Sequence, residues 1–368
     1  MVRGEVKMLR IENLLKQEDI IEGEAVLVSN ESNVKYMSAY TGESAYLILS
    51  HKGQVLMTDG RYDEQARNEC EGFEVTKWHN PKRPDPDTIL HYLRKYEISK
   101  LIFNGNDYTY NQFNALENAI KHHKLNISLE SRVGMIEKFR AIKTEDEIEN
   151  LRVACSIADK ALEALVPSIK IGVSELELVG ELEYNLKKFG AENISFDTII
   201  VSGIKTALPH GKPSNKKLEE GDFLQIDFGA LYKGYHSDMS RTFIIGNADD
   251  KQRELYEMML KATLVGIEAL KGDISAKDPD SAVREVISNE YIDYYYPGLG
   301  HGVGLDIHEG PSMSNTSTGK IEIGNVVTIE PGVYVPGWGG MRIEDTILVK
   351  EDGYEILSHF PRELQVLG

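Results

Sequence analysis

Short apolar runs alternate with helical patterns in the first third of the chain. Each run has four largely apolar residues bounded by polar or turn-forming stretches, which is typical of strands. The runs are residues 25–28, 46–49, 55–58 and 100–103. The helical patterns are residues 62–70, 87–96 and 110–123. The alternation predicts an α/β domain with a mostly covered sheet over residues 1–133, and residues 80–86, rich in proline, predict a surface loop.

A different pattern begins after residue 133. Thr144 with Glu147 and Ser174 with Glu177 have the spacing of capping boxes, so we expect one helix after each pair. From Phe196 onward strand patterns dominate, interrupted by helical patterns at residues 251–270 and 281–291. The sequence therefore predicts a second, α+β domain over residues 134–368.

Composition excludes some classes of protein. The chain has 368 residues and a net charge of −18, which argues against nucleic acid as a partner because proteins that bind it need a basic surface. No apolar run approaches the roughly 18 residues of a membrane span, so no membrane is expected. The first residues lack the apolar stretch of a signal peptide, which favours the cytoplasm. Cys70 and Cys155 form no ligand motif and are expected to be reduced core residues.

Carboxylates lie inside apolar, strand-like runs of the second domain. They are Asp227 in residues 223–228, Glu330 in residues 326–330 and Glu344 in residues 341–348. A buried carboxylate costs several kcal/mol unless a cation or strong donors compensate it. One such residue is most often a hydrogen-bonded core acid, but several need more positive charge than Arg342, the obvious local cation, supplies. Two divalent metal ions would provide it.

Further polar residues complete this set. Asp238 follows Asp227 by eleven residues, and a turn at Lys233-Gly234 predicts a hairpin that brings the two carboxylates together. Oxygen ligands suit Mn²⁺ or Mg²⁺, whereas an imidazole in the ligand set shifts the preference towards Mn²⁺, Fe²⁺, Co²⁺ or Zn²⁺. Mn²⁺ is therefore expected, with Co²⁺, Zn²⁺ and Fe²⁺ as alternatives.

Three histidines lie near turns. His301 and His308 flank a glycine-rich segment at residues 297–311, and His210 lies in another loop. The glycines do not have the spacing of a nucleotide-binding loop; they allow a tight backbone around His301. A lone histidine is usually structural, but these three suggest one metal ligand and two residues that handle protons or stabilise an oxyanion.

Taken together, these segments resemble the pita-bread metallopeptidases, specifically the Xaa-Pro branch that contains aminopeptidase P and prolidase. The matching segments of the second domain are Pro209-His210-Gly211, Ile226–Gly229, Ser237–Thr242, Gly300-His301-Gly302 with His308-Glu309, Thr328–Gly332 and Arg342–Asp345. Those before it are Asn33–Met37, Tyr40-Thr41-Gly42, Thr58–Tyr62 and, at the start of the catalytic domain, Arg140–Thr144. The resemblance implies a creatinase/prolidase-like α/β domain followed by an α+β pita-bread catalytic domain.

The resemblance also implies roles for the site residues. Asp227 would bind one of two metal ions, His301 and Glu330 would bind the other, and Asp238 and Glu344 would bridge them. Arg342 would hold a ligating carboxylate. Glu330 would also be the general base, and His308 and His210 would stabilise the tetrahedral intermediate.

The expected reaction is hydrolysis of the bond between an N-terminal residue and proline in short peptides, by a homodimer. Tyr334 and Trp338 are candidates for the proline pocket, with core packing as the alternative. The family often carries a histidine where this chain has Pro297, which affects the substrate mouth rather than the metal site. Two other interpretations are a non-catalytic pita-bread binding module and a creatine amidinohydrolase-like enzyme, but such relatives typically lack the ligands that are present here.

Overall fold

A computed structural model describes residues 3–78 and 85–368 of the chain, so the proline-rich loop expected at residues 80–86 lies mostly outside the described residues. The chain forms two compact units, Met1–Phe139 and Arg140–Gly368. The boundary expected at residues 133/134 precedes the observed division by a few residues, and the short helix α6 (Glu137–Ala141) crosses that division.

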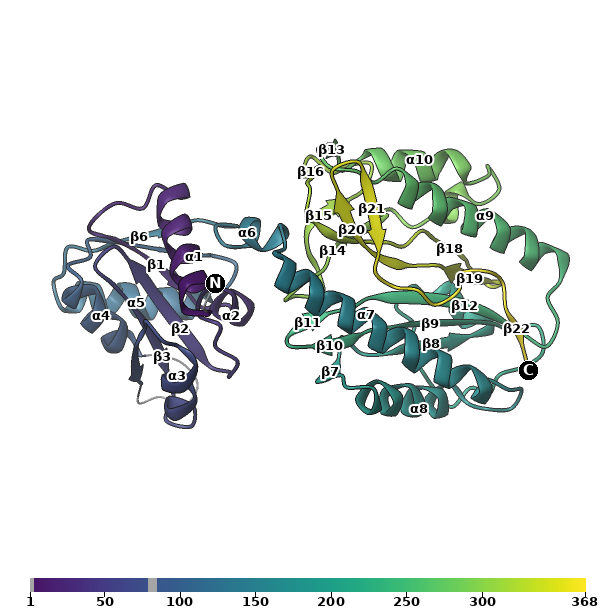
Figure 1. Cartoon of the computed structure of the whole chain (residues 1–368), viewed down its shortest axis with the longest axis horizontal. Helices are drawn as coiled ribbons and strands as arrows, with labels where there is room; N and C mark the ends of the chain where they lie inside the picture. The colour runs from purple at the N-terminus through teal and green to yellow at the C-terminus, as the bar shows by residue number, and fades with distance from the viewer. Residues whose placement is uncertain (1–2, 79–84) are drawn as a thin grey trace. The chain divides into compact units, whose positions relative to one another are not determined.

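The N-terminal unit is built around a six-stranded mixed sheet with the order β4-β3-β2-β1-β5-β6 (Figure 1). Strands β1, β2 and β3 are antiparallel neighbours, whereas β4, β5 and β6 each join a parallel neighbour. Its elements are α1 Arg3–Gln17, β1 Glu24–Val28, α2 Glu31–Ser38, β2 Ala45–Ser50, β3 Gly53–Thr58, α3 Asp63–Glu69, β4 Glu74–Lys77, α4 Pro86–Lys95, β5 Lys100–Phe103, α5 Tyr110–His122 and β6 Ser128–Ser131.

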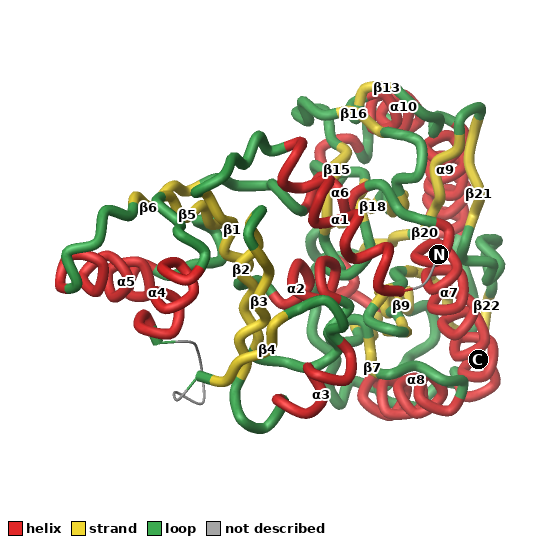
Figure 2. The backbone as a smooth tube through the Cα atoms, turned by 60° about the vertical axis from the view of Figure 1, so that its left-hand side comes forward, coloured by secondary structure: helices red, strands yellow, loops and turns green. Residues whose placement is uncertain are grey.

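The predicted strands and helices of this unit are present, because their apolar side chains form its core. Helices α4 and α5 cover one face of the sheet (Figure 2), where Leu90, Leu93 and Leu116 pack against strand residues such as Leu27 and Leu101. Helices α1 and α2 were not expected from the apolar pattern. Helix α2 has only eight residues and depends on local caps: the Asn30 side chain accepts from an N–H of its first turn, and the helix ends in a left-handed residue.

The C-terminal unit contains several antiparallel sheets and four longer helices. Its helices are α7 Glu145–Leu165, η1 Val166–Ser168, α8 Glu175–Lys188, η2 Gly203–Ala207, α9 Asp250–Glu268, α10 Asp278–Val286 and η3 Ile292–Tyr294. Its strands are β7 Asn193–Ile194, β8 Ile199–Ser202, β9 Phe223–Phe228, β10 Ala230–Tyr232, β11 Tyr235–His236, β12 Met239–Ile245, β13 Ile274–Ser275, β14 Gly300–Gly302, β15 Glu309–Met313, β16 Lys320–Ile321, β17 Val326–Ile329, β18 Gly332–Val335, β19 Gly339–Arg342, β20 Asp345–Lys350, β21 Gly353–Ile356 and β22 Val366–Leu367.

Two sheets of this unit carry the polar residues of interest, and each is backed by a pair of helices. Helices α7 and α8 pack with the sheet β22-β12-β9-β8 around one apolar core. Helices α9 and α10 pack around a second core that includes residues of β17, β18, β19 and β20. The sheets lie between the two helix pairs (Figure 1). The second of the two sheets, to which β17 and β20 belong, has the order β15-β14-β17-β20-β21.

The helix boundaries of the C-terminal unit follow the local signals in the sequence. The backbone N–H of Ser174 donates to Glu177, whose own N–H donates to the Ser174 hydroxyl, and α8 ends beside Gly190 at a φ of +108°. The helix expected at residues 281–291 is α10, which begins and ends earlier because Pro279 starts it and Ile287 is extended. Among the described helices, none is both long and apolar enough to span a bilayer.

Candidate metal centre and active site

Asp227 and Asp238 are brought together by neighbouring antiparallel strands. Asp227 lies near the end of β9, Asp238 immediately precedes β12, and the two strands pair with Ser240 opposite Asp227. Between them, Lys233 and Gly234 both have positive φ and close the hairpin of β10 and β11. The predicted hairpin is therefore present, and both carboxylates are buried and line the same cavity.

Glu330 and Glu344 are positioned by a second antiparallel pair. Glu330 follows β17 and Glu344 precedes β20, and these strands pair up to Ile329 opposite Asp345. The two glutamates lie directly beyond the end of this ladder, where the backbone N–H of Glu330 donates to the carbonyl oxygen of Leu299 at 2.8 Å and that of Glu344 to Ser240 at 3.1 Å. Both side chains line the cavity that contains Asp227 and Asp238.

His301 lies in the short strand β14, where its neighbours must be glycine. A Cβ atom on Gly300 would collide with the carbonyl oxygen of Thr328, and one on Gly302 with the carbonyl oxygen of Gly310. The strand also has an irregularity in register between His301 and Gly302. The glycines thus allow the close backbone approach that places the imidazole in the cavity.

These five side chains form one group, which we call the acidic cluster (Asp227, Asp238, His301, Glu330 and Glu344). The Nε2 atom of His301 is 3.2 Å from a Glu330 oxygen and 3.6 Å from an Asp238 oxygen. One ligand atom each from Asp238, His301 and Glu344 lie within 4.8 Å of one another. All five residues line a cavity of about 520 Å³.

Arg342 and Ser240 connect the carboxylates of the cluster. The buried Arg342 guanidinium pairs with Asp227 and donates to the Ser240 hydroxyl at 2.8 Å. That hydroxyl in turn donates to Glu344 at 2.7 Å. A third donor of Arg342 reaches the Tyr334 hydroxyl at 2.6 Å. The guanidinium is therefore placed to orient Asp227 directly and Glu344 through Ser240, and both carboxylates line the cavity.

The cluster holds more negative charge than its protein neighbours compensate. Burial raises the pKa values of Asp238 and Glu344 well above the usual carboxyl range, and the neighbouring carboxylates raise them further. Burial also raises the pKa of Asp227, although Arg342 opposes this. Within the described ranges, Arg342 is the only lysine or arginine in ion-pair contact with the cluster. A cation of high charge would relieve this repulsion.

The donor set fits a divalent metal ion. The Oδ1 atom of Asp227 is buried and has no hydrogen-bond partner among the described residues, and such an atom costs free energy unless something binds it. Burial alone would lower the pKa of His301, but its hydrogen bond with Glu330 raises it. The same contact outweighs burial and lowers the pKa of Glu330. Carboxylate oxygens with one imidazole are a ligand set for metals such as Mn²⁺ or Co²⁺.

His308 and His210 line the same cavity but are exposed, and we call them the exposed histidines. The rings of His301 and His308 meet edge to face with their centroids 4.4 Å apart. Burial, with the charge of His301, lowers the pKa of His308, so its imidazole is neutral near pH 7. A neutral imidazole on the open side of the cavity can donate a hydrogen bond to a bound carbonyl group.

A buried glutamate anchors the loop of His210. Glu175, fully buried at the start of α8, accepts hydrogen bonds from the backbone N–H groups of Ser202 and Ser214, both at 2.8 Å. It also accepts from both serine hydroxyls and pairs with Lys205. Since Ser202 and Ser214 are the two ends of the loop, one carboxylate fixes both of them.

The loop of His308 is anchored in a similar way. Glu309 pairs with Arg140 and with Lys143, whose Nζ is 3.2 Å away, and accepts from the N–H of Asp306 at 3.0 Å. Arg140 also pairs with Asp306 at 2.6 Å. Arg140 and Lys143 of the Arg140–Thr144 motif therefore both pair with Glu309, the residue that follows His308.

Several cavity residues were not identified from the sequence. They are Phe196, Asp197, Ile199, Tyr296, Ile307 and Ser312. They come from separate loops and strands, and no local pattern marks them. Ser240 belongs to the Ser237–Thr242 segment, and a serine two residues after Asp238 at the start of an apolar strand pattern is a sequence signal that could have identified it.

The expected proline-pocket candidates do not line this cavity. Trp338 packs edge to face on Phe223 with centroids 5.4 Å apart and lies beneath Lys251, so the packing alternative describes it. Tyr334 is buried and bonded to Arg342. Pro297 does line the cavity, next to Tyr296 and Gly298.

Comparisons with known proteins agree with this geometry. Residues 149–351 match metallopeptidase family M24, and residues 10–142 match the creatinase/prolidase N-terminal domain. A solved structure described as an Xaa-Pro dipeptidase from Bacillus anthracis has a TM-score of 0.92 and 38% identity, covering 98% of this chain and 100% of that chain. The X-Pro aminopeptidase structure from Thermotoga maritima has a TM-score of 0.86 and 33% identity, with 96% and 100% covered.

A curated relative shows the same similarity. The Xaa-Pro dipeptidase of Pyrococcus horikoshii is 38% identical over 344 residues, covering 93% of this chain and 94% of the relative. The predicted fold, a creatinase/prolidase-like α/β domain followed by a pita-bread catalytic domain, is thereby confirmed. The family match and the full-length relatives lead to one conclusion: the chain belongs to metallopeptidase family M24.

Proposed function

We propose that the protein is a dinuclear, metal-dependent Xaa-Pro peptidase, which hydrolyses the bond between an N-terminal residue and proline in short peptides. The observation that carries the proposal is the acidic cluster: four carboxylates and His301 around one cavity, with a single arginine to balance them. Relatives named as Xaa-Pro dipeptidase and X-Pro aminopeptidase, similar over nearly the whole chain, support this choice within the family.

Each member of the cluster has a proposed role. Asp227 would hold one of two metal ions, His301 and Glu330 would hold the other, and Asp238 and Glu344 would contribute to both. The buried, unpartnered oxygen of Asp227 and the short distances from His301 to Glu330 and Asp238 support this arrangement. Two bound divalent ions would supply Lewis-acid activation of a water molecule and of the scissile carbonyl.

The protein's own groups would move protons and stabilise charge. Glu330, kept ionised by its contact with His301, takes a proton from the attacking water and returns it to the leaving nitrogen. His308 and His210 donate hydrogen bonds to the oxyanion that develops on the scissile carbonyl. Arg342 holds Asp227 and, through Ser240, Glu344.

Proline suits a small closed site better than an extended groove. The nitrogen of an Xaa-Pro bond is a tertiary amide and has no N–H to donate to a strand edge. A cavity of about 520 Å³ lies in the size range of small-ligand sites and accommodates a dipeptide or tripeptide. Its apolar residues Phe196, Ile199 and Tyr296 offer surface for a proline ring and a neighbouring side chain.

The deciding experiment compares kcat/KM for Ala-Pro and Ala-Ala with Mn²⁺-loaded protein. We expect Ala-Pro to be preferred by well over the roughly 10–200-fold that a single methylene group gives. Equal rates would mean a broader aminopeptidase on the same metal site. An Ala-Pro-Ala tripeptide in parallel assigns the enzyme as an aminopeptidase if it is cleaved and as a dipeptidase if only Ala-Pro is.

Three further properties belong to this proposal. Mn²⁺ is the proposed ion because the ligands are mostly oxygens with one imidazole. A homodimer is proposed from the family resemblance. A cytoplasmic location is supported by Cys70 and Cys155, which are both buried free thiols, as expected in a reducing compartment.

A further inference from the structure

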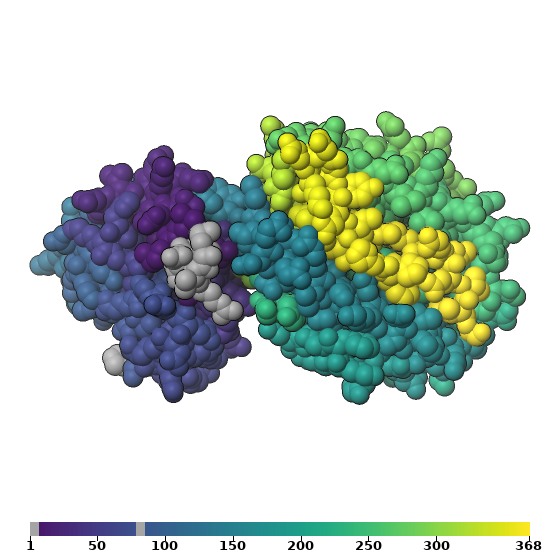
Figure 3. All heavy atoms as spheres, in the orientation of Figure 1, coloured from purple at the N-terminus to yellow at the C-terminus, as the bar shows by residue number. Residues whose placement is uncertain are grey.

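The residues that follow β21 form a partly buried support behind the acidic cluster, with Leu357, Ser358 and Phe360 buried and His359 and Pro361 exposed. We call residues 357–362 the C-terminal segment; they lie beyond residue 351, where the match to family M24 ends. The last residues of the chain cross one face of the C-terminal unit as a band beside α7 (Figure 3). Three connections lead from this segment towards Asp238 and Glu344, the two carboxylates proposed to bridge the metal ions.

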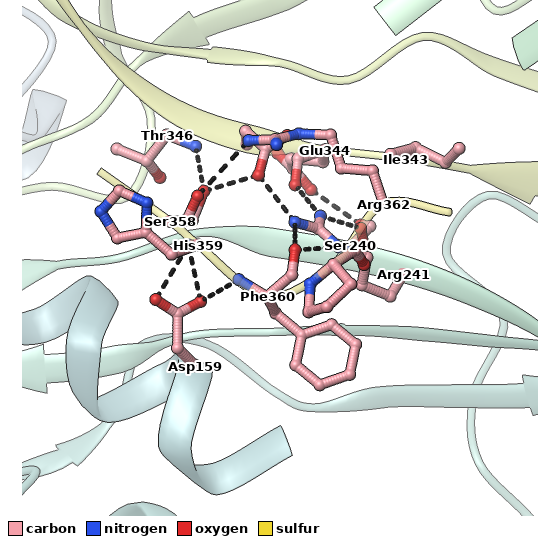
Figure 4. Close-up of polar contacts among 12 residues, drawn as sticks. Asp159, Ser240, Arg241, Ile343, Glu344, Thr346, Ser358, His359, Phe360 and Arg362 are labelled. Carbon is pink, nitrogen blue, oxygen red and sulfur yellow. Dashed lines mark hydrogen bonds and ion pairs between the residues drawn. The ribbon is translucent and has the colours of Figure 1, made fainter. Parts of the chain in front are cut away.

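The first connection is Arg241, whose guanidinium is almost fully buried. Its Nη1 atom donates to the backbone carbonyl oxygens of Glu344 at 2.6 Å and Ser240 at 2.9 Å. On its other side, Nη2 donates to the carbonyl oxygen of Phe360 at 2.6 Å, and Nε to that of Pro361 at 3.0 Å. Figure 4 shows Arg241 among Ser240, Glu344 and Phe360. One side chain thus ties the backbone of a proposed ligand to the C-terminal segment.

The second connection is a buried charge network. The Asp345 carboxylate is fully buried, accepts from Arg241 at 2.8 Å and from the Ser358 hydroxyl at 2.8 Å, and pairs with Arg362. Burial opposes its charge, but the two arginines outweigh this and lower the pKa of Asp345. Asp345 follows Glu344 directly in the chain, so the network fixes the position of that glutamate's backbone.

The third connection reaches Asp238. The hydroxyl of Thr346 donates to the carbonyl oxygen of Asp238 at 2.8 Å. The backbone of Thr346 is held by the C-terminal segment: its N–H donates to the Ser358 hydroxyl at 3.1 Å, and its carbonyl oxygen accepts from Leu357 at 2.9 Å. Ser358 and Thr346 lie next to each other in Figure 4.

The segment is itself anchored from outside the cluster. The Asp159 carboxylate of α7 accepts from the backbone N–H groups of His359 and Phe360 at 2.9–3.0 Å, as Figure 4 shows. The Phe360 ring packs edge to face on Phe243. The segment therefore also has contacts that do not involve Asp238, Glu344 or the residues that hold them.

We propose that the C-terminal segment sets the spacing of Asp238 and Glu344, with Arg362 and Ser358 as positioning residues that act through Asp345, Arg241 and Thr346. This rests on the proposed function, because it assigns the two carboxylates to a pair of metal ions. Neither Arg362 nor Ser358 is among the described residues that line the cavity. Arg362 pairs with Asp345, and Ser358 forms hydrogen bonds with Asp345 and Thr346. Such outer partners tune the affinity and arrangement of metal ions.

The test compares Arg362→Met with Arg152→Met. Arg152 pairs with Glu355 of β21 at 2.8 Å, so its loss also breaks an arginine–carboxylate pair in this part of the chain, but one that has no connection to the cluster. Mn²⁺ binding is measured by equilibrium dialysis, the Mn²⁺ pair by electron paramagnetic resonance, and the metal-free melting temperature by circular dichroism.

We expect Arg362→Met to bind the second Mn²⁺ about 10–100-fold more weakly and to lose part of the exchange-coupled Mn²⁺ spectrum. With Ala-Pro as substrate, kcat should fall while KM changes little. Arg362→Lys, which keeps a charge for Asp345, should restore most of the coupled spectrum. Arg152→Met should retain wild-type Mn²⁺ binding and spectrum.

Wild-type Mn²⁺ affinity and spectrum in a folded Arg362→Met protein would overturn the proposal. So would equal losses in Arg362→Met and Arg152→Met, since both would then report general destabilisation. If Arg362→Met does not fold, Ser358→Ala takes its place: it removes two hydrogen bonds without a change of charge, and normal Mn²⁺ binding there overturns the proposal. Because Mn²⁺ binding needs no substrate, these results stand apart from the Ala-Pro assay that tests the proposed function.

Discussion

The acidic cluster and the exposed histidines line the same cavity, yet the fold holds them in different ways. The carboxylates of the cluster lie on or directly beside paired strands, and their side chains are mostly buried. His210 and His308 are exposed on loops, and each loop is tied down by a buried glutamate, Glu175 or Glu309. The backbone hydrogen bonds between paired strands fix the positions of side chains on those strands, whereas side chains on loops need separate anchors.

This difference separates two kinds of defect. A change in the acidic cluster should alter metal content as well as turnover, because those residues are proposed to bind the metal ions. A change in the exposed histidines or their anchors should lower turnover while metal content stays normal.

Metal removal should have the largest effect. Chelator treatment should abolish Xaa-Pro hydrolysis, and Mn²⁺ or Co²⁺ should restore it, whereas Mg²⁺ alone should do so poorly because one ligand is an imidazole. Activity is measured against Ala-Pro, with metal content by elemental analysis. Full activity in a sample shown to be metal-free would refute the metal-dependent mechanism.

Glu330→Gln should lower kcat by several orders of magnitude, since the residue is proposed both as a ligand and as the base. The fold should survive, as judged by circular dichroism, and metal content should fall. Glu322→Gln, at an exposed position shortly before the same strand, is the matched control and should behave as wild type. Near-normal turnover in Glu330→Gln would assign the base to another residue.

His308→Ala should lower kcat by roughly 10²–10³-fold, as for the loss of one oxyanion donor, while metal content stays at the wild-type level. Steady-state kinetics and elemental analysis on the same preparation test both statements. His122→Ala, on the exposed surface of α5, serves as the control. Loss of metal together with activity would show that His308 contributes to metal binding, as the acidic cluster is proposed to do.

Glu175→Gln should have the smallest effect, on the order of tenfold in kcat/KM, because it loosens the loop of His210 without removing a group from the cavity. Hydrogen exchange at residues 202–214 should increase, and metal content should not change. Glu181→Gln, on the same helix but bonded to Ser168, is the control. Unaltered exchange in that loop would show that Glu175 is not its anchor.

Much of the fold could be predicted from local patterns. The four strand patterns of the N-terminal unit, the capping boxes before α7 and α8, and the Lys233-Gly234 hairpin all correspond to observed elements. Such signals act between residues close in the chain. Helix α2 was missed because Val34, Tyr36 and Met37 do not make an extended apolar period; Asn30 caps the helix, and five of its eight residues are buried.

The residue types and their local spacing were enough to indicate the chemistry of the site, because carboxylates within apolar strands need positive charge to compensate their burial. They also marked His301 by the glycines that its close backbone contacts require. Which other residues contact the site residues depends on the tertiary structure. Ser240 connects Arg342 to Glu344 by hydrogen bonds. Glu175 binds both ends of residues 202–214. The C-terminal segment is connected to Asp238 through Thr346 and to Glu344 through Arg241. These contacts join positions that are 27 to 119 residues apart in the chain, and no local pattern records them, because they depend on strand register and packing rather than on neighbouring side chains.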